Sequence, residues 1–248
     1  MPSYLNVDIK LVIYGVNYMR LVFVRHGEPD YDNDTLTENG LKQAEMTAER
    51  LQDEGISAIF SSPMGRAVKT ASFTADKLGL DIEKLDFMHE IDWGSKDGSE
   101  IAFNGHPWSL SFNLLAENPT YLSGSYWKEH PYFKNNKCLD YYLMISKEFD
   151  KFLERFGLYR KGALYEAKSE CNDTIALFAH GGSGGVMFAH LLNLSFPYVM
   201  TALPYGVCSV SIIEFEPKLN NMVVPLLELF NDMGHLDKVK LEPLRFEK

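Results

Sequence analysis

The sequence predicts a three-layer α/β/α sandwich with a mostly parallel central sheet and an inserted, aromatic-rich cap. Three observations lead to this fold class. Short apolar runs rich in β-branched residues alternate with segments of helical periodicity, as in parallel sheets covered by helices. Two of these runs end in a histidine followed by a glycine, at His26 and His180. The stretch 91–140 interrupts the alternation with nine aromatic residues and few periodic runs.

The chain first reads as a strand followed by a helix. The apolar run 20–24 is bounded by charged residues, as expected of a buried parallel strand. Thr37 is placed to cap a helix whose apolar residues follow helical spacing, and Gly55 is placed to end it. We therefore expect one complete strand and helix before residue 56.

A second strand and helix follow directly. Residues 56–60 predict a strand, after which Ser62 and Pro63 predict the start of a helix that runs to Leu78. Arg66 falls in the first turn of that helix.

The rest of the chain contains the predicted cap and the return of the α/β pattern. All three tryptophans lie within 91–140, which we expect to form a cap over the strand ends. Apolar patterning then predicts a helix at 142–156, a buried strand at 174–179, a helix at 186–194 after a glycine-rich turn, and two strand-like runs at 207–215 and 222–229.

Length and composition fit one domain. A chain of 248 residues with 46% apolar residues can bury a substantial core. We expect residues 19–248 to form this domain, with the cap inserted at about 91–140. Residues 1–18 are expected to be an extension, because Met19 directly precedes the first convincing strand. A real extra strand or a peripheral arm is the alternative for those residues.

The charge balance and the cysteines bear on partners and location. The 24 basic and 34 acidic side chains give a formal charge of −10, which makes nucleic acid an unfavourable partner. The three cysteines have no metal-site spacing and fit free thiols in a reducing compartment. No run approaches 18 apolar residues and no secretory signal is visible, so we expect a cytoplasmic protein without a membrane partner.

The candidate functional residues gather at the ends of three strands. His26 and His180 follow two parallel strands, whose carboxyl ends share one edge of the sheet, where open α/β folds bind ligands. Arg66 reaches the same edge from the first turn of a helix, whose free N–H groups favour anions. The pattern predicts a site for one negatively charged group.

These residues resemble the histidine phosphatase superfamily, which includes the phosphoglycerate mutases. Four motifs in order carry the resemblance, which covers most of the chain from Met19 to Phe230. They are Arg25-His26-Gly27-Glu28; Leu36-Thr37 with Gly40; Ser61-Ser62-Pro63 with Arg66; and Ala179-His180-Gly181-Gly182, with Glu90 lying before the cap.

The resemblance implies that His26 attacks phosphorus and carries the phosphoryl group. It implies that Arg25, Arg66, His180 and Gly181 hold the phosphate oxygens, and that no metal or organic cofactor is needed. Physical chemistry agrees, because neighbouring cations disfavour protonation of His26 and also stabilise charge on the transferring phosphoryl group.

Glu90 is the expected general acid and base, as its counterpart is in similar enzymes. Asp92 and Glu28 lie close in sequence and could take that role. One departure from the family pattern concerns a phosphate-binding asparagine six residues after the nucleophile, where this chain has Asp32. Asn33 could serve after a one-residue shift, or a backbone amide of the loop 29–34 could replace it.

The expected reaction is hydrolysis of a small phosphorylated metabolite through a phosphohistidine. A phosphoglycerate-type mutase ranks second, because its substrate needs basic cap residues and 91–140 has four lysines, no arginine and six carboxylates. A non-catalytic phospholigand-binding protein and a metal hydrolase are further alternatives, although two arginines would repel a divalent cation. The sequence leaves the substrate, the pathway and the oligomeric state open.

Overall fold

The computed structural model describes residues 19–122, 124–170, 172–216, 219–237, 239 and 241. The predicted extension at 1–18 lies outside the described residues.

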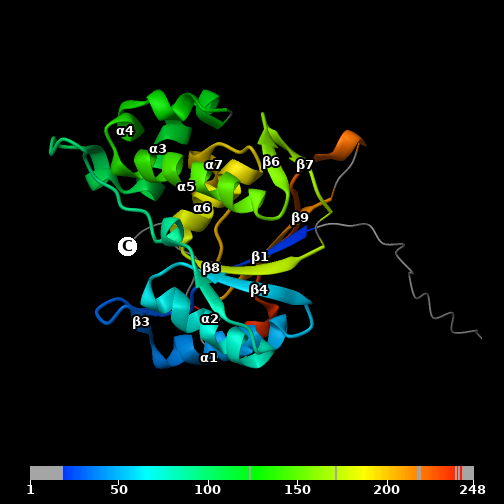
Figure 1. The fold of residues 1–248 in the computed structure, drawn as a ribbon. Helices are drawn as coiled ribbons and strands as arrows, with labels where there is room; N and C mark the ends of the chain where they lie inside the picture. Colours follow the sequence, from blue (N-terminus) through cyan, green and yellow to red (C-terminus); the bar gives the residue numbers. More distant parts are fainter. Residues whose placement is uncertain are drawn as a thin grey trace, which may run out of the picture.

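A six-stranded sheet forms the centre of the molecule (Figure 1). Its strand order is β11-β9-β1-β8-β4-β5, with β9 antiparallel to its neighbours and the other strands parallel to one another. The predicted, mostly parallel sheet is therefore confirmed. The strands are β1 (Met19–Arg25), β4 (Ile56–Ser61), β5 (Ile82–Lys84), β8 (Thr174–Ala179), β9 (Val210–Phe215) and β11 (Leu226–Asp232).

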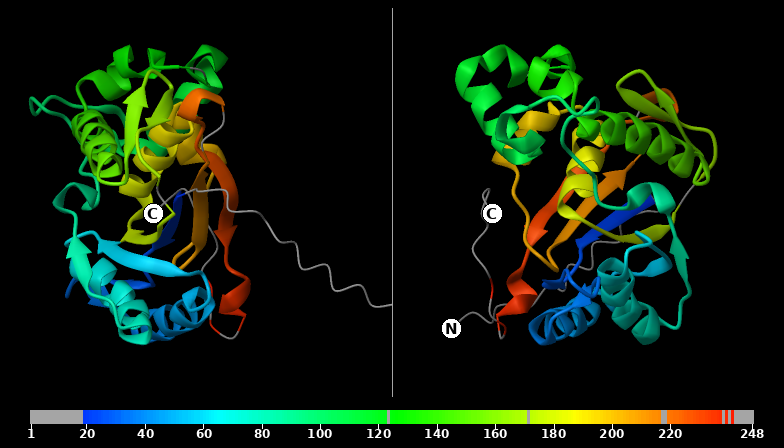
Figure 2. Two further views of the ribbon diagram at one scale, coloured as in Figure 1. Left: turned by 45° about the vertical axis from the view of Figure 1, so that its right-hand side comes forward. Right: turned by 90° about the vertical axis from the view of Figure 1, so that its left-hand side faces the viewer.

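Helices cover both faces of this sheet, which gives the three layers that the sequence predicts. Figure 1 and both views of Figure 2 place α1 and α2 on one side of the sheet and α5, α6 and α7 on the other. These helices are α1 (Glu38–Leu51), α2 (Gly65–Leu78), α5 (Lys137–Glu154), α6 (Gly181–Leu191) and α7 (Phe196–Ala202).

The alternation of side chains along β1 explains why both faces are covered. Leu21 and Phe23 belong to the large apolar core that includes residues of α5 and α6. Val22 and Val24 belong to the second core, which packs against α1 and α2. All four side chains are fully buried, and a strand buried on both faces reads as the continuous apolar run seen in the sequence.

Two predicted helix starts are corrected by the structure. The helix expected at Ser62 begins at Gly65, because the Ser62 hydroxyl accepts a hydrogen bond from the Met64 N–H in a turn before the helix. The helix expected at Val186 begins at Gly181, so the glycine-rich turn is the first part of α6. The Thr37 cap is confirmed, since its hydroxyl accepts from the Gly40 N–H.

Several short strands were not predicted. β6 (Leu158–Lys161) and β7 (Leu164–Ala167) form a hairpin. The strand predicted over 222–229 is divided into β10 (Met222–Val223), which extends this hairpin to a three-stranded sheet, and β11. β2 (Pro29–Asp30) and β3 (Thr35–Leu36) close the loop after the first strand.

Residues 91–140 form short helices and part of α5. The helices are η2 (Ala102–Gly105), α3 (Pro107–Glu117), η3 (Pro119–Leu122), η4 (Tyr126–Glu129) and α4 (Pro131–Lys134), and three further 3-10 turns lie elsewhere, at η1 (Asp86–Met88), η5 (Leu219–Asn221) and η6 (Gly234–Leu236). Trp127 and Phe133 are buried in the main core, whereas Phe112 and Tyr126 are exposed. The aromatic residues of this stretch thus divide between packing and surface; its role as a cap and the single-domain boundaries stay predictions.

Within the described residues, every helix is too short or too polar to cross a bilayer.

Candidate active site

The two predicted histidines lie side by side at the carboxyl ends of β1 and β8. The backbone N–H of His26 donates to the Ala179 carbonyl at 2.9 Å, which ties the two strand ends together. The imidazole centroids are 5.1 Å apart, and the residues are only 2% and 0% exposed. The structure therefore brings together the two residues that the sequence placed on one sheet edge.

Hydrogen bonds fix the tautomer of His26. Its Nδ1 lies 2.7 Å from the carbonyl oxygen of Gly27, and a carbonyl only accepts, so Nδ1 carries the proton. The lone pair is then on Nε2, which faces the Nε–H of Arg66 at 3.4 Å. Nε2 is the nitrogen that can act as a nucleophile.

The backbone at Gly27 requires a residue without a side chain. A Cβ added there would lie 2.8 Å from the carbonyl oxygen of Gly40, closer than real Cβ atoms come to other atoms. The backbone of Gly40 therefore approaches Gly27 closely, which brings the start of α1 against the His26 segment.

Arg66 is held by a carboxylate that the sequence analysis did not identify. Its Nη1 donates to Asp34 Oδ1 at 2.7 Å, and the Gly65 N–H donates to Asp34 Oδ2 at 2.6 Å. Arg66 is 6% exposed, so Asp34 holds a nearly buried cation against the start of α2. The exposed ring of Tyr31 covers this guanidinium, with its centroid 5.5 Å from Cζ. No motif signalled Asp34, because its partners lie more than 30 positions along the chain.

Arg25 approaches the same region from the end of β1. Its Nη1 donates to the backbone carbonyl of Tyr205 at 2.8 Å. A Cβ added at Gly181 would lie 3.5 to 3.7 Å from the guanidinium atoms, which places Arg25 against the first turn of α6. Its Nε is buried and has no hydrogen-bond partner among the described residues.

His180 is oriented by Ser62, which the sequence analysis used only as a helix start. The His180 Nε2 lies 2.7 Å from the Ser62 hydroxyl, and that hydroxyl also accepts from the Met64 N–H at 3.3 Å. His180 Nδ1 is buried and has no hydrogen-bond partner in the described part of the chain. If the Ser62 hydroxyl donates to Nε2, Nδ1 carries the proton and is a free donor inside the pocket.

Burial lowers the pKa of His180 far below its usual range, and the positive charges of Arg66 and Arg25 lower it further. The imidazole is therefore neutral at physiological pH and offers one N–H rather than a charge. A neutral ring can sit beside two arginines without repulsion.

The unpartnered donors identify the chemistry that the pocket can perform. Arg25 Nε and His180 Nδ1 come from two adjacent strand ends, and both are buried without a partner among the described residues. A buried donor left unsatisfied costs about 1–3 kcal/mol. An anion with several oxygens, bound next to His26 Nε2, would satisfy both donors and face the Arg66 guanidinium.

Glu90 contacts the start of α6. Its carboxylate accepts hydrogen bonds from the backbone N–H groups of Gly182 at 3.1 Å, Ser183 at 2.9 Å and Ile91 at 2.9 Å. Glu90 therefore caps α6 close to His180 and to the Arg25 guanidinium that lies against Gly181. The Glu90 carboxylate is therefore held by three backbone N–H groups, two of them in the first turn of α6.

The alternative carboxylates lie in other surroundings. The Glu28 carboxylate accepts hydrogen bonds from the Thr37 hydroxyl and the Asn39 side-chain amide. Glu28 therefore stabilises the start of α1. Asp92 is exposed and forms an ion pair with Lys137 at 3.0 Å. Neither has a described hydrogen bond to the pocket residues, so the structure favours Glu90.

The structure does not bring Asn33 into the pocket. Asn33 is exposed, and its side-chain amide donates to Asp30 Oδ2 at 2.8 Å within its own loop. The physical reason is that Asp34, rather than Asn33, turns toward α2, with a left-handed φ of 46°. In this loop Asp34 is therefore the residue that contacts Arg66. The fourth phosphate contact, from Asn33 or from a backbone amide of 29–34, stays a prediction.

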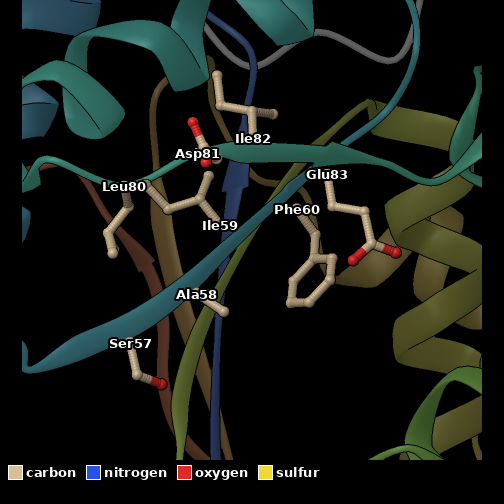
Figure 3. Close-up of a pocket in the computed structure, with 8 residues that line it drawn as sticks. All are labelled: Ser57, Ala58, Ile59, Phe60, Leu80, Asp81, Ile82 and Glu83. Carbon is tan, nitrogen blue, oxygen red and sulfur yellow. The ribbon is translucent and has the colours of Figure 1, made fainter.

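Two further observations on the described residues bear on alternative sites. Among the described residues, no group of three His, Cys, Asp or Glu side chains could hold a metal ion. Figure 3 shows a hollow at the β4–β5 edge of the sheet. Its ionisable residues are the carboxylates Asp81 and Glu83, which would repel a phosphate.

Comparisons with known proteins agree with this fold. Residues 21–113 match the family model of the histidine phosphatase superfamily (branch 1). The putative phosphoserine phosphatase 2 of Hydrogenobacter thermophilus is 26% identical over 173 residues, which cover 66% of this chain and 74% of that protein. The probable phosphoglycerate mutase GpmB of Proteus mirabilis is 32% identical over 93 residues, which cover 34% of this chain and 43% of the mutase.

The solved structure of phosphoserine phosphatase from Entamoeba histolytica, in complex with 3-phosphoglyceric acid, has the same fold. It superposes with a TM-score of 0.58 at 21% identity, covering 88% of this chain and 99% of that chain. Over residues 21–113 the chain is similar to the histidine phosphatase superfamily. This similarity confirms the resemblance carried by the motifs, and the phosphatase relatives support the predicted enzyme class, a phosphatase.

Proposed function

We propose that the protein hydrolyses small phosphomonoesters through a covalent phosphohistidine at Nε2 of His26. One observation carries the proposal: Nε2 is the unprotonated nitrogen of a buried imidazole and lies 3.4 Å from Arg66 Nε. The same two strand ends carry Arg25 Nε and His180 Nδ1, which are buried and have no partner among the described residues. The phosphoserine phosphatase relative is consistent with this class of substrate.

In the first step, the Nε2 lone pair of His26 attacks phosphorus and the bond to the ester oxygen breaks. Arg25, Arg66 and the Nδ1–H of His180 stabilise the charge on the phosphoryl oxygens. The leaving oxygen takes the bonding electron pair and receives a proton from Glu90, which must first take up that proton and turn from its α6 amides toward the oxygen.

In the second step, water attacks the phosphorus of the phosphohistidine. Glu90, now ionised, accepts a proton from this water as the new P–O bond forms and the P–N bond breaks. Inorganic phosphate leaves and His26 returns with its proton on Nδ1, held by the Gly27 carbonyl. The backbone amide of Gly181, at the first position of α6, is proposed as a further donor to the phosphoryl oxygens.

A phosphoglycerate-type mutase is the second candidate, because a mutase is among the relatives. A mutase must hold the second acidic group of its substrate, so it needs free cations around the pocket. Three of the four lysines in 91–140 form ion pairs with carboxylates, and the fourth lies over aromatic rings; the residues are Lys96, Lys134, Lys137 and Lys128. These contacts favour hydrolysis over transfer.

Replacing His26 tests the proposal. A folded His26→Ala protein should lose at least ~10³-fold in turnover of p-nitrophenyl phosphate, because the nucleophile and the covalent intermediate are both removed. Rapid quenching of the unmodified protein should show one acid-labile phosphoryl group. His130→Gln, which changes a half-buried histidine that the mechanism does not use, should keep turnover within about twofold. Turnover near that of the unmodified protein in folded His26→Ala would refute the mechanism.

A further inference from the structure

We propose that Trp93, His106 and Trp108 form an aromatic subsite at the mouth of the phosphate pocket, which binds a planar apolar leaving group such as an aryl or arylalkyl alcohol. This inference rests on the proposed function, because it assigns the substrate class of the same pocket.

The three rings form one cluster from two separate segments. The Trp93 ring lies 5.4 Å from His106 and 6.1 Å from Trp108, both nearly perpendicular, and the His106 ring lies 5.2 Å from Trp108 at 32°. Trp93 is 36% exposed and His106 and Trp108 are half-buried, so the cluster keeps ring surface open to a ligand. A buried packing cluster, such as that around Trp127, leaves no such surface.

The chain from Glu90 places one side of this cluster at the pocket. The Glu90 carboxylate accepts hydrogen bonds from the backbone N–H groups of Gly182 and Ser183 at the start of α6. The next residue, Ile91, packs against Gly182. Trp93 follows only three residues after Glu90, which limits their Cα separation to about 11 Å. A leaving group protonated by Glu90 is therefore within reach of Trp93.

The packing of α3 places the other side of the cluster at the same mouth. The Ser195 hydroxyl, just before α7, donates to the Tyr121 carbonyl just after α3, so the end of α3 meets the start of α7. Because α3 and α7 pack along one another, Trp108 in the first turn of α3 lies near the end of α7. From there the chain leads within three residues to Tyr205, whose carbonyl binds Arg25.

Electrostatics favour an uncharged leaving group. The stretch 91–140 has no arginine, and its lysines are engaged by Asp140, Glu129, Asp92 and the rings of Trp127 and Tyr142. Burial lowers the pKa of His106, so this imidazole is neutral and presents a ring and a hydrogen-bonding nitrogen rather than a charge. A leaving group with its own carboxylate would find no free cation among these side chains.

A further exposed ring, from the loop that follows β1, lies beside Arg66. Tyr31, which is 59% exposed, covers the guanidinium of Arg66. An aromatic leaving group thus meets ring surface beside the phosphate-binding arginine as well as at the Trp93 cluster, where ring pairing adds to area burial.

Binding to the non-hydrolysing His26→Ala protein tests the subsite independently of turnover. Calorimetry should compare 2-phenylethyl phosphate with butyl phosphate, because both have alkyl leaving oxygens and differ in the ring. We expect 2-phenylethyl phosphate to bind about tenfold more tightly, and phosphoserine and 3-phosphoglycerate no more tightly than butyl phosphate.

Variants in the same background assign the preference to the rings. Trp93→Ala/Trp108→Ala should reduce the tenfold difference to less than about twofold while butyl phosphate affinity stays within about twofold. Phe112→Ala, which removes an exposed ring from the same helix as Trp108, should keep the full preference. Should the double variant fail to fold, Trp93→Leu, a change at an exposed position, tests the same point.

Equal binding of the two esters, no binding of either, a preference that survives removal of both tryptophans, or tighter binding of the acidic phosphates would each overturn the inference. Turnover of the same esters by the unmodified protein separates the two proposals. Selective binding without phosphate release would refute the proposed hydrolysis and leave the subsite standing, whereas release of phosphate without selectivity would refute only the subsite.

Discussion

Single hydrogen bonds decide which nitrogen of each active-site histidine carries the proton. The Gly27 carbonyl holds the proton on Nδ1 of His26, and the Ser62 hydroxyl contacts Nε2 of His180. The sequence identified both histidines because each ends a strand and belongs to a recognisable motif. The roles of Ser62 and Asp34 could not be predicted, because each contacts a residue that is distant in sequence and that only the fold brings near. Ser62 contacts His180, 118 positions away, and Asp34 contacts Arg66, 32 positions away.

Ser62 should act as a positioning residue for His180. Ser62→Ala removes the only described partner of His180 Nε2, so the imidazole loses its preference for the Nδ1–H tautomer and the inhibition constant of inorganic phosphate should rise about tenfold. Ser62→Thr keeps the hydroxyl and should restore most of the affinity. The neighbouring Ser61→Ala removes a buried hydroxyl that donates only to backbone, and should leave phosphate inhibition unchanged. Equal effects at the two serines would show that Ser62 is merely structural.

Glu90 should matter most for substrates with poor leaving groups. Glu90→Gln cannot transfer the proton, so its turnover should fall by ~10²-fold or more with alkyl phosphates, whereas the first step with p-nitrophenyl phosphate needs little protonation. Phosphohistidine should then accumulate as a burst, because water still needs a base. The variant also places an NH₂ group against backbone donors, so it should lose about 1 kcal/mol of stability through the α6 cap.

The control for Glu90 is Asp92→Asn, which removes an exposed carboxylate paired with Lys137. This variant should retain activity on both substrate types within about twofold. Equal losses for alkyl and nitrophenyl phosphates in Glu90→Gln, without a trapped intermediate, would turn attention to Asp92 or Glu28.

Among the elements, the start of α6 shows where sequence patterning fails. Glycines have poor helix propensity, so the run from Gly181 to Gly185 reads as a turn. In the structure the run is helical. Side chains at Gly182, Gly184 and Gly185 would collide with Glu90, Phe23 and Met200, respectively, so the packing of the helix requires glycine at these three positions. The hairpin of β6 and β7 was missed for another reason: two four-residue strands are too short to show a period.

Two glycines of α6 should respond oppositely to alanine. A Cβ at Gly184 would lie 2.3 Å from the ring of Phe23 and 2.6 Å from the Tyr205 hydroxyl, so Gly184→Ala should destabilise the protein by about 1–3 kcal/mol. At Gly181 the nearest atoms are 3.5 Å away, so Gly181→Ala should leave stability unchanged or raise it by up to about 1 kcal/mol. Urea denaturation measures both. Similar losses at the two positions would contradict the packing of α6 against β1.

At the scale of the whole molecule, the protein has a formal net charge of −10, whereas its candidate active site contains the two arginines Arg25 and Arg66. The net charge from the composition predicts only which partners are attracted or repelled at long range. The sign of the electrostatic potential at the active site depends instead on which side chains the strand ends bring together. The sequence predicted the sheet and its layers because the core strands are short, continuous apolar runs. It could not place the cap rings, because their positions depend on how α3 packs against α7.

The burial of His180 makes global stability depend on pH. Its folded pKa is lowered, chiefly by burial, whereas in the unfolded chain a histidine titrates near ~6.5, so below that pH the unfolded state binds a proton that the folded state does not. Stability therefore rises with pH up to about 6.5 and falls on acidification, with His180 contributing about 1.4 kcal/mol per pH unit between pH 6 and 5. The pKa values of His106, His130 and His235 are also lowered by burial, so their contributions to the pH dependence of stability have the same sign.

Urea denaturation at pH 7, 6 and 5 should show this dependence of the unfolding free energy on pH, and His180→Asn should reduce its slope by about one proton. A stability that stays flat from pH 7 to 5, or an equal slope in folded His180→Asn, would mean that His180 accepts a proton without unfolding and that the neutral imidazole assigned to the phosphate pocket is wrong.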